Sequence, residues 1–328
     1  MSSVDSSLID LLAPVEAGLE QMREHLAREL QPKSASVSDM TTHIASFRGK
    51  QLRGALVLLC AQAHGHEHED LPSVAAIVEM IHLATLVHDD VLDGAEVRRR
   101  VASVNVRWDN QTAVLLGDYL YARAFGFSTR LSSRLCSQVL SDTTQRICEG
   151  EIDQALGRYA FEATIEEYER IAGAKTAALY SAACELGARY PDGDAAQGKA
   201  MARYGWALGL AFQIVDDCLD VVGREEVVGK SVGNDVEDGK VTLPVLHVFT
   251  NSDEATRSQI RDAYTLPGLE KRAERLREVC DLEPGVSFAF GRAEELVRDA
   301  RASLQALAPS PARESLDALG AFVVQRKF

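Results

Sequence analysis

The chain has 328 residues, of which 46% are hydrophobic, and it carries a formal net charge of −14 at pH 7. This acidic excess argues against a nucleic-acid-binding surface, and no block of basic residues indicates a membrane-binding segment. A chain of this length can bury a sizeable core, in one large domain or in two smaller ones.

Apolar residues recur at three- and four-residue spacings along almost the whole chain, and the alternation typical of half-buried strands is almost absent. This periodicity predicts an all-α protein. The breaks between the expected helices are short and no long linker separates two halves, so we expect one bundle-like domain over residues 1–328. The expected helices span residues 5–30, 51–64, 72–93, 109–130, 133–157, 164–189, 195–222, 241–250, 253–264, 268–280, 285–307 and 311–325.

The six cysteines lack CxxC spacing and mostly fall within apolar helical patterns, so we expect buried free thiols rather than zinc sites or disulfides. This usage points to a reducing cytoplasm. The first residues do not follow the pattern of a secretion signal, and no apolar run reaches the length of a transmembrane helix. We therefore expect a soluble cytoplasmic protein without stable membrane insertion.

Two stretches place three aspartates at positions i, i+1 and i+4 inside otherwise apolar runs. On a helix the first and third carboxylates stack one turn apart, with the second beside them. Ionised carboxylates on an apolar face are costly unless a cation neutralises them, and Mg²⁺ suits a few carboxylate oxygens that it shares with substrate phosphates. One triplet alone fits a solvated helix face equally well, whereas two copies predict a diphosphate site. The triplets are Asp89, Asp90 and Asp93, and Asp216, Asp217 and Asp220.

Basic residues that could donate to diphosphate oxygens occur in several places. Lys50 and Arg53 lie one turn apart at an expected helix start, where backbone N–H groups also favour an anion. Each basic residue alone is more often a surface charge, but together they supply the charge that a diphosphate requires. The candidates are Lys50, Arg53, Arg98, Arg99, Arg100, Lys175, Lys230 and Lys240.

Three histidines alternate with acidic residues after the expected helix 51–64. These are His64, His66 and His68. Alternating spacing in a loop fits a tetrahedral ligand set poorly, so we interpret this segment as a solvated turn rather than a metal site.

With these residues in this order, the chain resembles the trans-isoprenyl diphosphate synthases, also called polyprenyl synthetases, over nearly its whole length. It looks most similar to bacterial medium- and long-chain members. The resemblance implies one large all-α bundle of the isoprenoid synthase type around a central cavity, and a homodimer. It rests on Gly49-Lys50-x-x-Arg53, Glu79-Met80-Ile81-His82, Asp89-Asp90-x-x-Asp93, Arg98-Arg99, Gly117-Asp118, Glu149-Gly150-Glu151, Lys175-Thr176, Phe212-Gln213-x-x-Asp216-Asp217-x-x-Asp220, Gly229-Lys230, Gly233-Asn234-Asp235 and Gly239-Lys240-x-Thr242-Leu243-Pro244.

The resemblance also implies a role for each motif residue. Three Mg²⁺ ions would be held by Asp89, Asp93 and Asp216, and these would be supported directly or through water by Asp90, Asp217 and Asp220. The allylic diphosphate would be bound by Arg98, Lys175, Lys230 and Lys240, with Thr176 and Gln213 nearby. The diphosphate of isopentenyl diphosphate would be bound by Lys50, Arg53, His82 and Arg99. One departure is Arg100, which stands where the family commonly has a glycine.

These roles describe a prenyltransferase that adds isopentenyl units head to tail to an allylic diphosphate. A geranylgeranyl diphosphate synthase is the runner-up. A terpene cyclase or head-to-head synthase fits less well, because it would lack the isopentenyl site of Lys50 and Arg53. A non-catalytic subunit of a heteromeric synthase fits least, because such subunits typically lose the aspartates.

Product length is expected to depend on Ala84 and Thr85, one turn before Asp89. Both side chains would line the start of the product tunnel on that face of the helix. In the family, bulky aromatic residues at these two positions stop growth early, so small residues imply elongation past farnesyl diphosphate. Phe125 and Phe127 are candidates for the tunnel floor, with ordinary core packing as the alternative. We expect a hexaprenyl to octaprenyl product.

Overall fold

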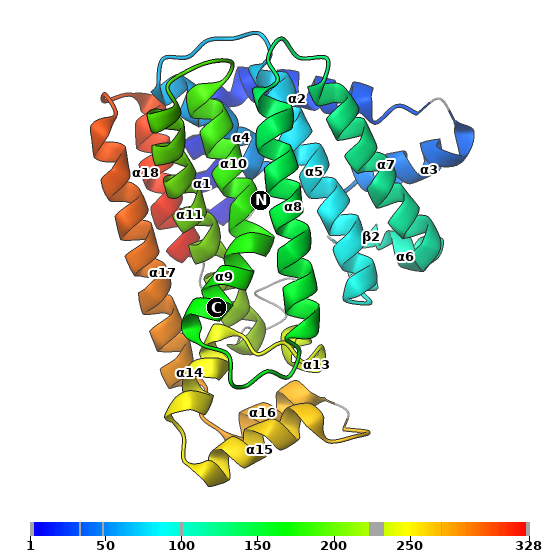
Figure 1. Ribbon diagram of the computed structural model, residues 1–328, viewed down its shortest axis with the longest axis vertical. Coiled ribbons are helices and arrows are strands. Elements are labelled where there is room, and N and C mark those ends of the chain that lie inside the picture. Colours follow the sequence, from blue (N-terminus) through cyan, green and yellow to red (C-terminus); the bar gives the residue numbers. More distant parts are fainter. Residues whose placement is uncertain are drawn as a thin grey trace. The chain divides into compact units, whose positions relative to one another are not determined.

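The computed structural model describes residues 3–32, 34–47, 49–98, 101–222, 233–269 and 271–325, and these are mostly helical (Figure 1). The strands among them are β1 (Val97–Arg98) and β2 (Val101–Ala102), which pair antiparallel with Arg98 opposite Val101. The prediction of an all-α protein is therefore confirmed, with one short hairpin that the sequence pattern did not indicate.

The chain divides into two compact units. Unit 1 comprises Met1–Thr144, Leu179–Gly205 and Ser303–Ala318, and unit 2 comprises Gln145–Ala178, Trp206–Ala302 and Leu319–Phe328. The single domain over residues 1–328 stays a prediction. In chain order the helices are α1 (Ser3–Leu12), η1 (Ala13–Val15), α2 (Glu16–Glu29), α3 (Ala35–Ala45), α4 (Leu52–Ala63), α5 (Leu71–Leu92), α6 (Val104–Arg107), α7 (Asn110–Ser128), α8 (Leu135–Leu156), α9 (Ile165–Ala172), η2 (Gly173–Ala177), α10 (Ala178–Arg189), α11 (Ala195–Val222), α13 (Asn234–Glu237), α14 (Leu243–Asn251), α15 (Glu254–Thr265), α16 (Arg272–Val279), α17 (Glu283–Ser303), η3 (Leu304–Ala306) and α18 (Pro311–Val324).

Two of the expected helices are interrupted. The helix expected over 5–30 breaks at η1, where Pro14 lies in the first turn, because proline has no N–H and clashes with the preceding turn of a helix. The helix expected over 164–189 is interrupted by η2, a π-helical segment over Gly173–Ala177. The sequence pattern also missed α3, whose Ile44 lies in the core.

The core of unit 1 forms around α5, on which α2, α4 and α7 pack. Its apolar residues Leu83 and Val87 meet Leu116 and Leu120 of α7, together with Ile44 of α3. By length and composition α5 could cross a membrane, contrary to the expectation that no apolar run is long enough. However, 83% of its most apolar window is buried, as in the core helix of a globular protein.

The core of unit 2 contains a group of packed aromatic rings among aliphatic residues. Phe161, which follows α8, packs its ring 4.7 Å from that of Phe249 on α14 and 5.1 Å from that of Tyr264 on α15. Burial of three rings removes a large apolar area from water and fixes the loop after α8 on these helices.

All six cysteines are free thiols, and Cys148 is the exposed one among them.

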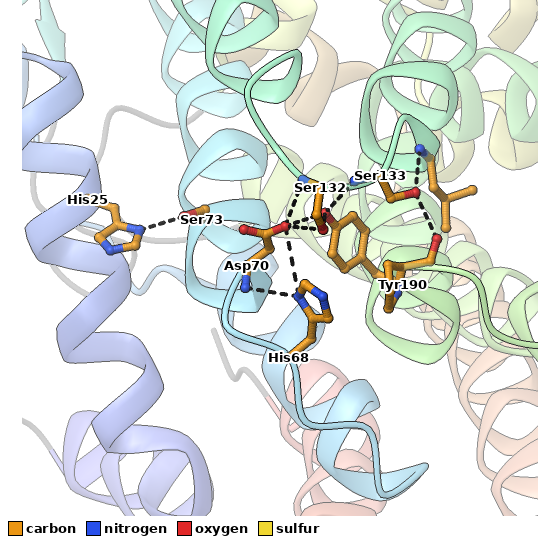
Figure 2. A network of polar contacts seen from close by, with 9 residues as sticks. His25, His68, Asp70, Ser73, Ser132, Ser133 and Tyr190 are labelled. Atoms are coloured by element: carbon orange, nitrogen blue, oxygen red, sulfur yellow. Dashed lines mark hydrogen bonds and ion pairs between the residues drawn. The ribbon is translucent and has the colours of Figure 1, made fainter.

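The start of α5 is fixed by a polar network in unit 1 (Figure 2). The carboxylate of Asp70 accepts hydrogen bonds from the Ser132 hydroxyl at 2.6 Å and the Tyr190 hydroxyl at 2.7 Å, while its own N–H donates to His68. Burial tends to raise the pKa of Asp70, but the bonds from Ser132 and Tyr190 outweigh it and lower that pKa. His68 therefore belongs to a structural network at the start of α5.

Candidate active site

The first aspartate triplet lies at the C-terminal end of α5. Asp89 and Asp90 belong to its last turn, and Asp93 caps the helix through its N–H, which donates to the Asp89 carbonyl at 2.8 Å. Asp89 and Asp93 are half-buried, whereas Asp90 is completely buried. Because helical geometry extends to Asp93, the two accessible carboxylates lie one turn apart, as the spacing predicts.

The buried middle aspartate of this triplet is paired with Arg98. The Arg98 guanidinium donates through Nε at 2.8 Å and Nη2 at 2.5 Å to Oδ1 of Asp90. Burial raises the pKa of Asp90, and the guanidinium opposes that rise. Arg98 of β1, which we expected to bind the allylic diphosphate, thus has a protein partner in Asp90 of α5. Arg99 and Arg100 lie outside the described residues.

A glycine on α7 allows close packing beside this triplet. A Cβ at Gly117 would lie 2.1 Å from Nε2 of His88, the residue before Asp89. The same His88 nitrogen lies 3.1 Å from the Val114 carbonyl and 3.6 Å from the Asp118 carboxylate. The Gly117-Asp118 motif therefore has a packing role, because only glycine leaves room for this imidazole between α5 and α7.

The residues expected to bind isopentenyl diphosphate lie near the start of α4 and on α5. Lys50 is exposed, and Arg53 and His82 are half-buried. The Arg53 guanidinium lies over the ring of Tyr180, 4.5 Å from its centroid, which fixes the direction of a long side chain. Tyr180 was missed by the sequence reasoning, since an aromatic residue in an apolar helical pattern carries no specific signal.

One backbone N–H at the start of α4 is already occupied. Gly54 donates to Oε1 of the buried Glu79 at 2.8 Å, so an acidic side chain takes the place of an external anion there. The expectation that N–H groups at this helix start favour an anion thus applies first to Glu79. A bound diphosphate would rely on the side chains of Lys50 and Arg53.

The second triplet lies near the end of α11 in unit 2. Asp216 is half-buried, whereas Asp217 and Asp220 are 5% and 4% exposed. Oδ2 of Asp220 accepts the N–H of Asp235 at 3.0 Å, which links the triplet to the segment after 232. The two triplets therefore differ at the third aspartate, which is half-buried in the first and buried in the second. The half-buried member of the second triplet, Asp216, is the one expected to hold metal.

Both oxygens of Asp217 have donors. Gln213 Nε2 donates to Oδ1 at 2.7 Å, and the Tyr168 hydroxyl on α9 donates to Oδ2 at 2.5 Å. Burial, followed by the charge of Asp235, raises the pKa of Asp217 to about 8. Burial and the neighbouring carboxylate also raise the pKa of Tyr168 well above its usual value, so the phenol keeps the proton that it donates.

Lys175 and Thr176 both lie in the π-helical segment η2, a type of helix distortion that is frequent at functional sites. Lys175 Nζ lies 3.0 Å from Oε2 of Glu151 and 3.0 Å from Oε1 of Gln154, and its side chain is 18% exposed. Thr176 donates to Oε1 of Gln213 at 2.6 Å. Thr176 and Gln213, both expected near the allylic diphosphate, are thus in direct contact, and their substrate-binding role stays a prediction.

Lys240 follows a tight turn in unit 2. Gly233 and Gly239 adopt φ values of 85° and 76°, which are unfavourable for other residues. Lys240 Nζ lies 3.1 Å from the Asp238 carboxylate and 3.6 Å from that of Asp235, and its side chain is 10% exposed. Lys230 lies outside the described residues.

The residues expected to set product length differ in environment. Ala84 is completely buried in the core cluster of unit 1, whereas Thr85 is half-buried. Phe127 is buried, with its ring centroid 6.4 Å from that of His25, and Phe125 is half-buried. Thr85 precedes Asp89 by four residues and so shares its helix face, while Ala84 faces the core.

Among the described residues, no group of three or more acidic, histidine or cysteine side chains is arranged to enclose a metal ion. Mg²⁺ usually binds through one or two carboxylates and completes its shell with water and substrate phosphates. Half-buried carboxylates one turn apart, such as Asp89 and Asp93, are suitable donors of this kind.

An all-α fold in which two helices each carry an aspartate triplet is typical of isoprenoid synthases, and comparison with known proteins agrees. The sequence profile of the polyprenyl synthetase family matches residues 34–282. The octaprenyl diphosphate synthase of Escherichia coli is 34% identical over 94% of this chain and 99% of its own. A short chain isoprenyl diphosphate synthase of Methanothermobacter thermautotrophicus is 36% identical over 89% of this chain and 93% of its own.

A solved structure is similar along almost the whole chain. The polyprenyl synthase from Caulobacter crescentus, complexed with calcium and isoprenyl diphosphate, has a TM-score of 0.91 and 32% sequence identity, and 98% of each chain is covered. The chain therefore belongs to the polyprenyl synthetase family of prenyl-transferring enzymes.

Proposed function

We propose that the protein condenses isopentenyl diphosphate head to tail with an allylic diphosphate in a Mg²⁺-dependent reaction that gives a medium- or long-chain polyprenyl diphosphate. The observation that carries the proposal is the burial of the six aspartates. Asp89, Asp93 and Asp216 are half-buried, and their three neighbours in the triplets are buried. The accessible set is the one that the family resemblance assigns to three Mg²⁺ ions.

The three buried aspartates accept hydrogen bonds from other parts of the protein. Asp90 is paired with Arg98, Asp217 accepts from Tyr168 and Gln213, and Asp220 accepts from the backbone of Asp235. Groups that hold and orient a ligand residue strengthen metal sites. We propose that these three carboxylates position the accessible ones and the segments around them.

The chemistry begins with the allylic C–O bond, whose electron pair leaves with pyrophosphate and generates a carbocation. Mg²⁺, when bound, supplies Lewis-acid stabilisation of the leaving group. Lys175 and Lys240 add positive charge, and an incoming diphosphate would compete with Glu151 and Asp238 for these ammonium groups. Lys230 is proposed to contribute in the same way.

The second substrate is held by its own diphosphate. We propose that Lys50, Arg53, His82 and Arg99 bind this group. The double bond of isopentenyl diphosphate then attacks the carbocation and forms the new C–C bond, and the proton released restores a double bond. We propose that the departed pyrophosphate, which is released next to the carbocation, accepts that proton. The product is again an allylic diphosphate, so the cycle repeats.

Site-directed variants test this proposal. Asp89→Ala and Asp216→Ala should each reduce turnover by orders of magnitude with the helical circular-dichroism signal unchanged, because each removes a half-buried metal ligand. Asp142→Ala is the matched control, since Asp142 is an exposed aspartate in α8. Near-normal turnover of either site variant with Mg²⁺ would exclude the three-metal assignment.

For the product we propose hexaprenyl to octaprenyl length, supported by small Thr85 on the face of Asp89 and by the octaprenyl synthase relative. A geranylgeranyl product is the second candidate, which the short chain relative favours.

We also propose that the enzyme works in the cytoplasm, where a reducing environment keeps its six cysteines free.

We further propose a homodimer. The last turn of α5, β1, α6 and α7 of unit 1 each carry exposed apolar residues, and a second copy of the chain would cover them. They are Leu92, Val97, Val106, Val114 and Leu115. Light scattering during size exclusion should report twice the chain mass, and Leu115→Glu should give monomers while Leu156→Glu, at an exposed position of α8, should not. A monomeric wild type would contradict the dimer.

A further inference from the structure

Each oxygen of the Asp217 carboxylate accepts a hydrogen bond from a protein side chain. Gln213, one turn earlier on α11, occupies Oδ1, and the Tyr168 hydroxyl from α9 occupies Oδ2. Because the residue is 5% exposed and each oxygen already has a donor, little of the carboxylate is open to a cation. Asp217 is therefore suited to anchor α11 rather than to bind metal.

The donor Tyr168 lies on a helix that is itself firmly held. At the start of α9, the Thr164 and Glu167 side chains exchange hydrogen bonds with each other's backbone in a capping box. One residue after Tyr168, Glu169 pairs with Arg292 of α17 through two bonds of 2.6 and 3.0 Å. Such supports keep a side chain in one geometry.

The second donor is equally constrained. Gln213 accepts from Thr176 through its oxygen and donates to Asp217 through its nitrogen, which fixes the orientation of its amide. The carboxylate of Asp217 is thus held between α9 and the π-helical segment that carries Lys175. Of its two donors, Tyr168 is the one from outside α11, and our assignment of the site from sequence did not include it.

We propose that Tyr168 is a positioning residue for the second aspartate triplet. Its hydroxyl holds Asp217, and through Asp217 it sets the place of the adjacent Asp216 for binding a divalent cation. The inference rests on the proposed function, in which Asp216 is a metal ligand. Tyr168 itself touches neither metal nor substrate, so its effect is on metal affinity.

The experiment compares Tyr168→Phe with Tyr204→Phe. Both variants lose only a hydroxyl that donates a hydrogen bond. Tyr204 lies on α11 and donates to the Leu316 carbonyl in unit 1 at 2.7 Å. Loss of a group that orients a metal ligand typically weakens metal affinity by about 10- to 100-fold. Tyr168→Phe should raise the Mg²⁺ concentration for half-maximal turnover by a factor in that range, and Tyr204→Phe should leave it unchanged.

A second readout does not depend on turnover. Mn²⁺ binding in the presence of pyrophosphate, followed by electron paramagnetic resonance, should weaken for Tyr168→Phe and not for Tyr204→Phe. Asp217→Asn should weaken it too, and the double variant should be no weaker than Asp217→Asn alone, because both changes break the same link. Additive effects, or equal Mn²⁺ affinity in Tyr168→Phe and wild type, would overturn the proposal.

The outcomes separate the two proposals. A wild type that makes no prenyl product with Mg²⁺ overturns the proposed function, whereas an active wild type with an unchanged metal requirement in Tyr168→Phe overturns only the positioning role. If Tyr168→Phe loses helical structure while Tyr204→Phe keeps it, the hydroxyl serves folding and the positioning role is also overturned.

Discussion

Removing the Arg98 side chain is expected to destabilise the protein well beyond the usual effect of a surface substitution. In Arg98→Ala the completely buried Asp90 loses the guanidinium that donates to its Oδ1 at 2.8 and 2.5 Å. Breaking a buried ion pair by removing one partner typically costs about 3–5 kcal/mol. The Arg98 side chain is 28% exposed, so water can replace part of its contribution. We therefore expect a loss of about 2–4 kcal/mol.

Urea unfolding at neutral pH measures this loss as a lower midpoint with an unchanged slope. Adding Asp90→Asn to Arg98→Ala should recover part of the stability, because it removes the unpaired charge. Arg170→Ala is the control, since Arg170 pairs with Asp153 at 2.6 Å on the surface, and such pairs are worth about 0–1 kcal/mol. If Arg98→Ala costs no more than Arg170→Ala, Asp90 does not depend on Arg98 and the assignment of a buried ion pair is wrong.

The other predictions concern three regions. Asp70→Asn should cost about 1–3 kcal/mol at neutral pH. Because the pKa of Asp70 is lowered in the folded protein, its contribution is present above the unfolded-state pKa and disappears as pH falls through the folded-state pKa, so wild type and variant should converge in acid unfolding. Arg53→Ala should mainly raise KM for isopentenyl diphosphate, and Lys175→Ala should mainly raise KM for the allylic primer. Each change should cost ~1.5–3 kcal/mol of binding free energy. Steady-state kinetics giving equal effects on both substrates would contradict the two-site assignment. Thr85→Phe should shift the product, measured by mass spectrometry, toward farnesyl or geranylgeranyl diphosphate, whereas Ala84→Phe should instead cost about 1–3 kcal/mol by overpacking the core. An unchanged product from Thr85→Phe would show that the tunnel does not run along this face.

The sequence pattern was informative where chemistry depends on local spacing. Three aspartates at i, i+1 and i+4 already place the first and third on one helix face, and the apolar spacing over 72–93 predicted the helix α5. The pattern was less informative where a side chain's role depends on a partner far along the chain. Nothing near Asp217 indicates that its donor would be Tyr168, because an isolated tyrosine in a helix resembles any other core aromatic.

The interruptions within helices also differ in how far the sequence indicates them. Pro14 is a local signal for the break at η1, but the apolar spacing continues on both sides of it and led us to expect one helix. The π-helical segment at Lys175 was not visible, because its residues are compatible with a regular helix. Packing gives a reason for the small residues there, since a Cβ on Gly173 would lie 2.3 Å from the Trp206 ring.

Product analysis tests the central claim most directly. The purified chain would be incubated with isopentenyl diphosphate and farnesyl diphosphate, with Mg²⁺ or with excess EDTA, and the products measured by mass. Head-to-tail transfer predicts linear polyprenyl diphosphates longer than the primer by whole isopentenyl units, only when Mg²⁺ is present. Cyclic hydrocarbons, products formed equally well in EDTA, or consumption of the primer without isopentenyl diphosphate would contradict it.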